Sequence, residues 1–107
     1  MSVPNYTDNA PIPVVIDADL QDLIPGFMKR RREDVDKLVA AVERQDFKSV
    51  RLIGHSLKGN GGGYGFHDLS TIGAAIESAA NGEDLDSARA AIEQFVDYLD
   101  RVRISFE

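Results

Sequence analysis

Residues 46–65 read DFKSVRLIGHSLKGNGGGYG, an apolar periodicity that runs into a cluster of glycines. Asp46 is a favourable N-cap residue, so a helix is predicted to begin just after it. Apolar side chains then recur at spacings of three and four residues, which is typical of a helix with one buried face. These side chains are Val50, Ile53 and Leu57. The glycine run at 61–63 is expected to end the helix, because glycine is a poor helix former.

Three further helices are predicted on the two sides of this stretch. The first covers about 19–44 and the next about 66–80, where Gly82 follows as a stop signal. The last begins near Asp84 and keeps its apolar spacing of three and four as far as Phe106. Each of these segments is amphipathic, so each has a face to bury against the others.

No stretch alternates apolar and polar residues for long enough to predict a strand in a sheet. The predicted fold class is therefore all-α, an antiparallel four-helix bundle with a short N-terminal capping helix or segment. Residues 1–16 hold three of the four prolines and are expected to form a flexible lead-in that ends in a short extended piece. The bundle domain is assigned to residues 17–107.

The composition excludes several classes of protein. The chain has 107 residues, which suits one domain that buries its own core. It has no cysteine, so a disulfide scaffold, a thiolate metal site and a cysteine nucleophile are excluded, and a cytoplasmic location is expected. The formal net charge of -6 argues against a nucleic-acid binder, and no apolar run is long enough to predict a membrane span.

The functional interpretation depends on His55. On a helical wheel the apolar residues of its helix face the core, so His55 points to solvent. The residues that share its face are Lys48, Arg51, Leu52, Lys58, Gly59 and Gly62. No acid of this helix lies among them, which predicts a local basic patch on an acidic protein. Glycine inside a helix costs about 1 kcal/mol relative to alanine, so the two glycines are interpreted as giving a partner access to the imidazole.

Metal binding and nucleotide binding are each a poor fit to this face. His67 is the only other histidine, and no carboxylate of the same helix completes a ligand set with His55. Ser56 points well away from His55, and the glycines are not part of a phosphate-binding Gly-Lys-Ser/Thr loop. A phosphoryl group on the imidazole fits better. A neutral ring nitrogen is a nucleophile, and Lys58 lies one turn away, within reach of the added charge.

The stretch from His55 to Gly65 resembles the His-x-Leu-Lys-Gly signature of histidine-containing phosphotransfer (HPt) domains of bacterial two-component phosphorelays. The resemblance extends over about 17–102 in helix order and length. It implies that His55 accepts a phosphoryl group from the aspartate of one receiver domain and passes it to another. On this interpretation the protein is a phosphoryl carrier and not an enzyme with turnover.

The resemblance also assigns roles to the neighbours of the histidine. Lys58 would steady the phosphoryl group and Gly59 would leave room for it, while Leu52 and Gly62 would belong to the surface that docks a receiver domain. The basic residues Lys48 and Arg51 would suit the acidic pocket of such a receiver.

The expected partners are the receiver domains of hybrid histidine kinases and of response regulators, met by a monomer. The chain needs no metal or cofactor of its own, since magnesium is expected on the receiver domain.

Two alternatives stay open. The chain could be the phospho-accepting domain of a chemotaxis-type histidine kinase, which is phosphorylated by a linked ATP-binding domain. It could also belong to a different class, a helical adaptor that binds partners without any chemistry at His55.

Three other features have simpler interpretations. The basic run at 29–32 is expected to be a solvated face that pairs with acids one turn on, at Glu33, Asp34 and Asp36. His67 is expected to be a helix-start residue without chemistry. Glu77 could lie near the His55 end of the bundle or be an ordinary surface carboxylate, and the sequence alone does not decide between them.

Overall fold

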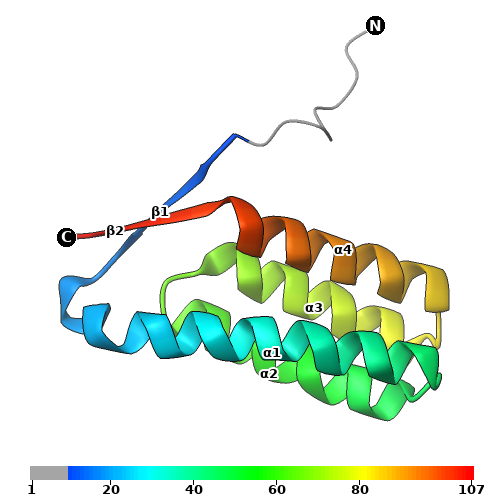
Figure 1. The fold of residues 1–107 in the computed structure, drawn as a ribbon. Coiled ribbons are helices and arrows are strands. Elements are labelled where there is room, and N and C mark those ends of the chain that lie inside the picture. The colour runs from blue at the N-terminus through cyan, green and yellow to red at the C-terminus, as the bar shows by residue number, and fades with distance from the viewer. Residues whose placement is uncertain (1–9) are drawn as a thin grey trace, which may run out of the picture.

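The computed structural model describes residues 10–107, and its four helices lie side by side (Figure 1). They are α1 (Ile24–Glu43), α2 (Phe47–Gly63), α3 (His67–Asn81) and α4 (Leu85–Arg101). Consecutive helices join at alternating ends, so each runs back along the one before it (Figure 1). The chain is mostly helical with four helices, as predicted. Most of the predicted lead-in, residues 1–9, lies outside the described residues.

Two short strands correct the prediction that the chain holds no sheet. Strand β1 (Ile12–Ile16) pairs in parallel with β2 (Val102–Phe106), with Ile12 opposite Val102 and Ile16 opposite Phe106. The predicted fourth helix therefore ends early, at Arg101. Apolar residues at 99, 102 and 106 fit a helix, but 102, 104 and 106 fit a strand equally well, and a periodicity argument does not separate the two.

Between β1 and α1 lies a single 3₁₀ segment, Ala18–Leu23, which is labelled η1. Asp17 caps it by accepting a hydrogen bond from the backbone N–H of Asp19 at 2.9 Å. Pro25 follows in the first turn of α1, where a missing N–H is tolerated.

Side-chain caps begin two of the helices where the sequence predicts. Asp46 accepts hydrogen bonds from the backbone N–H of Ser49 at 3.1 Å and from its hydroxyl at 2.6 Å. Asp84 caps α4 in the same way through Ser87. These contacts hold the pKa of both aspartates below the ordinary value, chiefly through the bonds from the serine that each one caps.

Each of the three turns between helices contains one residue with a left-handed backbone. These residues are Gln45, Gly65 and Glu83, with φ of 54°, 93° and 50°. Helix α3 stops at Gly82, as predicted; the φ of Gly82 itself is -85°, and Glu83 takes the left-handed position. The helices are thus connected by turns of three residues each.

The interior is apolar, and one basic residue reaches into it. The largest fully buried side chains are Phe27, Phe66, Phe95, Ile16, Leu38, Leu57, Leu69, Ile76 and Val50. Arg31 is only 7% exposed; its guanidinium lies 4.6 Å from the centroid of the Phe27 ring and 2.9 Å from the Asp34 carboxylate. The prediction that the run 29–32 is a wholly solvated face is therefore wrong for this residue. The Arg31 side chain is accommodated there because the Phe27 ring and the Asp34 carboxylate both stabilise its charge.

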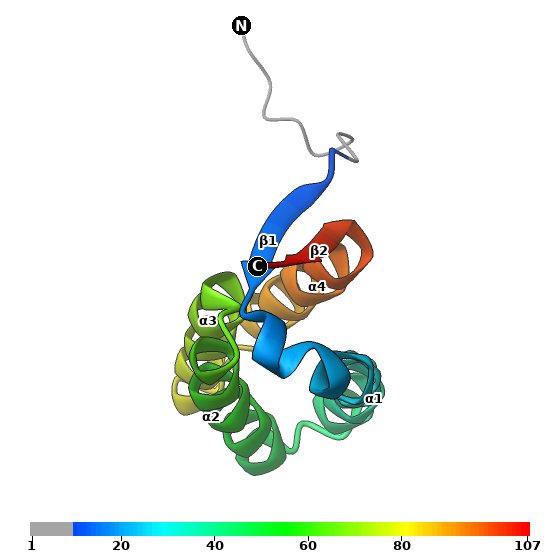
Figure 2. The same cartoon turned by 90° about the vertical axis from the view of Figure 1, so that its left-hand side faces the viewer.

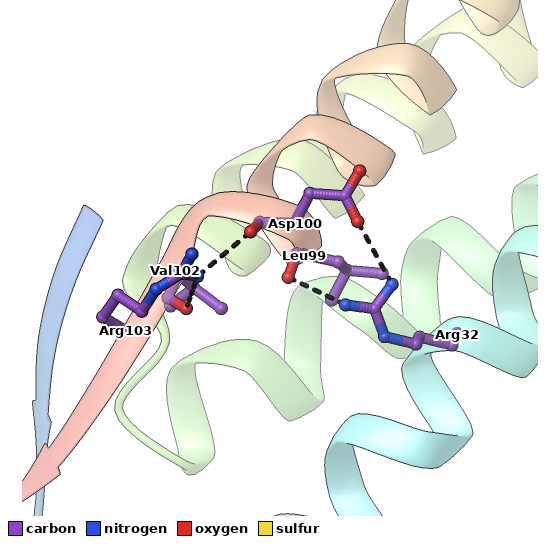
Figure 3. Close-up of polar contacts among 5 residues, drawn as sticks. All are labelled: Arg32, Leu99, Asp100, Val102 and Arg103. Atoms are coloured by element: carbon purple, nitrogen blue, oxygen red, sulfur yellow. Dashed lines mark hydrogen bonds and ion pairs between the residues drawn. The ribbon is translucent and has the colours of Figure 1, made fainter. Parts of the chain in front are cut away.

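The C-terminal end of α4 is held by two arginines (Figure 3). The guanidinium of Arg32, on α1, donates to the backbone carbonyl of Leu99 at 3.0 Å and to the carboxylate of Asp100 at 3.3 Å. Arg103 donates to the carbonyls of Asp100 and Val102 at 3.0 and 2.9 Å. These bonds satisfy carbonyls that a helix end leaves without partners, at the point where α4 turns into β2.

Within the part of the chain that the structure describes, none of the helices is both long and apolar enough to cross a membrane.

Candidate functional site

His55 stands in the middle of α2 with its side chain largely in solvent. The side chain is 67% exposed, which agrees with the prediction from the helical wheel. Lys58 lies one turn further along the same helix and is 43% exposed. The apolar residues of α2, with Val50 and Leu57 fully buried, fix the opposite face against the core and so aim the imidazole outward.

The acid at this face comes from the neighbouring helix. Glu77, on α3, places one carboxylate oxygen 2.8 Å from Nδ1 of His55 and accepts a hydrogen bond from Nζ of Lys58 at 2.8 Å on the other oxygen. The Glu77 side chain is only 18% exposed, so solvent screens these two contacts less than it would on an open surface. The carboxylate therefore bridges the two residues that the sequence selects.

The charge state of Glu77 decides which imidazole nitrogen carries the proton. The hydrogen bond from Lys58, followed by the one from His55, holds the pKa of Glu77 below its ordinary value, so the group is an anion at neutral pH. An ionised carboxylate only accepts hydrogen bonds, so Nδ1 of His55 must donate. When the ring is neutral, its lone pair is then on Nε2.

The glycines around His55 fall into two groups. A Cβ built on Gly59 would meet no atom within 4 Å, so this position is open, in keeping with the access predicted for it. Gly62 is also exposed, with the Ser70 hydroxyl 3.8 Å from such a Cβ. In contrast Gly54 and Gly61 are buried against α3. Access for a partner therefore explains only part of the glycine cluster.

The four predicted docking residues all lie on α2, as His55 does, and three of them are exposed to solvent. Leu52 is 51% exposed, which is high for a large apolar side chain. Lys48 and Gly62 are exposed as well, while Arg51 is half-buried. The outer face of α2 thus combines basic groups with one exposed leucine around the imidazole.

Glu77 is the residue of this contact whose position the sequence left undecided. Nineteen residues separate it from Lys58 and twenty-two from His55, so helical periodicity within one segment does not place it. A usable signal was the pair Gly54 and Gly73, one on each helix, since small residues facing each other mark a close helix crossing. Within residues 10–107 no three His, Cys, Asp or Glu side chains lie close enough together to hold a metal ion.

The chain is 34% identical over 88 residues to an isomaltose glucohydrolase of Kribbella flavida, a match that covers 73% of this chain. The same match spans only 23% of the glucohydrolase. No solved structure matches the chain significantly. The family model of the Hpt domain matches residues 22–105, which include all four helices and the His55–Glu77–Lys58 contact. The chain belongs to the Hpt-domain family.

Proposed function

We propose that this protein is a phosphoryl carrier of a two-component phosphorelay, with the phosphoryl group on Nε2 of His55. The observation that supports the proposal most strongly is the Glu77 carboxylate on Nδ1 of an exposed imidazole. That contact keeps the proton on Nδ1 and leaves Nε2 with its lone pair. Membership of the Hpt family supports the same conclusion, because Hpt domains act with receiver domains in phosphorelays.

The transfer needs no proton to leave the attacking nitrogen. The Nε2 lone pair forms a bond to phosphorus, and the bond between phosphorus and the receiver aspartate breaks, with its electron pair returning to the aspartate carboxylate. The ring keeps its Nδ1 proton and gains a positive charge. Glu77, 2.8 Å away, is placed to stabilise that charge, as an acid partner does in other histidine-based sites. Transfer to a second receiver runs the same steps in reverse.

Lys58 and Gly59 complete the proposed site. In the structure the Lys58 ammonium is bonded to Glu77, and its flexible stem allows it to reach a phosphoryl group one turn away. Gly59 leaves the approach to the ring open. Leu52, Lys48, Arg51 and Gly62 are proposed as the surface that docks the receiver.

The wider setting is proposed on the same basis. The partners are receiver domains of hybrid histidine kinases and response regulators, which supply the magnesium ion, and the relay operates in the cytoplasm. The carrier itself is proposed to have no cofactor and no turnover. We take the helices as an antiparallel four-helix bundle in which the segment 17–23 caps one end.

The Glu77 contact also favours a second candidate, the phospho-accepting domain of a chemotaxis-type kinase. A carboxylate that stabilises positive charge on the ring helps most when the phosphoryl donor is less reactive than an aspartyl phosphate, and ATP is such a donor. The match to the glucohydrolase suggests no sugar chemistry for this chain. Most glycoside hydrolases use two carboxylates, whereas this site is built from one histidine, one lysine and one glutamate.

The test is transfer of label from receiver domains that have been phosphorylated with acetyl phosphate. The wild type should gain an acid-labile and alkali-stable label, and His55→Gln should gain none. His67→Gln is the matched control, because His67 is the other histidine and is exposed at the start of α3. It should label like the wild type. Equal labelling of His55→Gln would overturn the proposal, and labelling by ATP with a kinase domain alone would favour the second candidate.

A further inference from the structure

Helices α2 and α3 approach so closely that their backbones touch at two glycines. A Cβ built on Gly73 would lie 2.5 Å from the backbone nitrogen of Lys58 and 2.8 Å from the carbonyl oxygen of Gly54. A Cβ built on Gly54 would lie 2.7 Å from the backbone nitrogen of Glu77. Non-bonded carbon does not come this close to backbone atoms, so only glycine fits either position without a shift of one helix.

The two contacts are reciprocal, and each involves a residue of the site. Gly54, on α2, lies against the backbone of Glu77 on α3. Gly73, on α3, lies against the backbone of Lys58 on α2. The crossing therefore sets the distance between the backbones of Glu77 and Lys58, whose side chains meet at 2.8 Å between Oε1 and Nζ.

We propose that Gly54 and Gly73 are positioning residues, which hold α2 and α3 at the one separation from which Glu77 reaches both Nδ1 of His55 and Nζ of Lys58. The contact between the helices, and not the length of the side chains alone, then selects the Nδ1–H tautomer. The inference rests on the proposed function only in that Nε2 is taken as the attacking nitrogen.

The other glycines of α2 show that this role is specific to position. A Cβ on Gly63 would meet nothing within 4 Å, so this glycine sets no spacing. Gly61 also packs against α3, with 2.7 Å between such a Cβ and the backbone nitrogen of Ser70. It touches neither Glu77 nor Lys58 itself, although the Ser70 hydroxyl donates to the Lys58 carbonyl at 2.6 Å. Gly61→Ala should therefore create a clash comparable in size to that of Gly54→Ala, at a place away from Glu77.

The first test measures the tautomer of the neutral His55 ring by ¹H–¹⁵N correlation NMR, without any partner or phosphoryl donor. The ratio of Nδ1–H to Nε2–H forms should fall about tenfold in Gly54→Ala, as expected for loss of one hydrogen bond to a charged group. In Gly61→Ala the ratio should stay within about twofold of the wild type, although that variant also loses packing. An unchanged ratio in Gly54→Ala, or an equal fall in Gly61→Ala, would overturn the proposal.

A second variant keeps the proposal testable if Gly54→Ala does not fold. Glu77→Asp keeps the charge but shortens the side chain by one methylene, at a partly buried position where the smaller side chain fits. Since the glycines already bring the backbones into contact, α3 has no room to move closer. The shorter aspartate should therefore no longer reach Nδ1 of His55. The tautomer ratio should fall as in Gly54→Ala. A ratio that stays at the wild-type value would show an adjustable spacing and contradict the proposal.

Because both tests are made on the unphosphorylated protein, they are independent of the labelling experiment. Failure of phosphoryl transfer with a normal tautomer response would reject the proposed function and leave the positioning role standing. A labelled His55 with no tautomer response would do the opposite.

Discussion

The α2–α3 pair and the α1–α4 pair pack in opposite ways. Viewed from one end, α2 and α3 lie together on one side of the molecule and α1 and α4 on the other (Figure 2). The first pair meets backbone to backbone through Gly54 and Gly73. Between the second pair, valines that remain partly in solvent line surface grooves, such as Val39 at 44% and Val96 at 37% exposed. A groove of about 260 Å³ runs beside Val39 between these helices.

The difference shows which pair of helices is held at a fixed separation. Where side chains separate two helices and line a groove, small shifts and repacking leave some freedom in the spacing. Backbone atoms in contact have no such freedom. The bridging carboxylate lies on the pair without freedom, whereas α1 and α4 are joined at one end by the long side chain of Arg32 (Figure 3).

The largest effect is expected from one added methyl group between α2 and α3. Gly73→Ala gains helix propensity but forces a carbon against the Lys58 backbone. The free energy of unfolding should fall by about 2 kcal/mol, measured by urea denaturation. A variant as stable as the wild type would mean that the crossing is not close, and the comparison between the two helix pairs would fail.

A glycine-to-alanine substitution where no helix lies opposite should raise the free energy of unfolding and not lower it. Gly63→Ala adds its methyl group in open space near the end of α2. Alanine is the better helix former, so the free energy of unfolding should rise by up to about 1 kcal/mol. A loss of stability like that of Gly73→Ala would show that α2 rejects any side chain there and that the crossing is not the cause.

Tyr98, on α4, should make the molecule sensitive to alkali. Its buried hydroxyl has no hydrogen-bond partner among the described residues, and burial, with a smaller contribution from Asp68, raises its pKa to about 12. An unfolded tyrosine ionises near 10, so this group favours folding below pH 10 and loses that contribution as the pH rises through 12. The wild type should therefore lose about 1 kcal/mol more than Tyr98→Phe between pH 8 and 11. The free energy of unfolding is measured by urea denaturation across that pH range. Equal losses of free energy in the two proteins would contradict the prediction.

The polar contacts of Arg32 with Leu99 and Asp100 should contribute little to the stability of the fold. Arg32→Gln removes an exposed ion pair and a bond to the Leu99 carbonyl. The free energy of unfolding should fall by about 0.5 kcal/mol at low salt and by less at high salt, because salt screens exposed charges. Arg30→Gln, at an exposed position of the same helix, is the control and should change nothing. A loss above about 2 kcal/mol would make this end of the molecule as strictly held as α2–α3.

The smallest effect is expected from one added methyl group between α1 and α4. Val39→Ile enlarges a half-exposed side chain beside the groove. The free energy of unfolding should stay within about 0.5 kcal/mol of the wild type in the same urea assay. If it fell as far as in Gly73→Ala, the two interfaces would be equally intolerant and the contrast between them would disappear.

Local sequence signals predicted the helices and part of the site. Asp46 and Asp84 cap the helices that they were expected to begin, and the apolar periodicity placed His55 in solvent. These features depend on residues within about one turn of each other. A single sequence therefore contains what is needed to predict them.

Features that join distant segments were the ones missed. The parallel pairing of Ile12 with Val102 spans ninety residues, and each strand is only five residues long, so neither gives a strong local pattern. The Glu77 bridge depends on the register between α2 and α3, which periodicity within one helix leaves undetermined. The glycines that set this register were visible, but in α2 their cluster was interpreted as access for a partner, and only Gly59 and its exposed neighbours fit that interpretation.

The position of the phosphoryl group on the imidazole is the most direct test of attack by Nε2. The wild type, phosphorylated by a receiver domain that labels it, is examined by ³¹P–¹H correlation NMR. Attachment at Nε2 places phosphorus next to two carbons that carry protons, so correlations from phosphorus to both Hε1 and Hδ2 of His55 are expected. A correlation to Hε1 alone would place the phosphoryl group on Nδ1, the nitrogen that contacts Glu77 in the structure, and would rule out attack by Nε2.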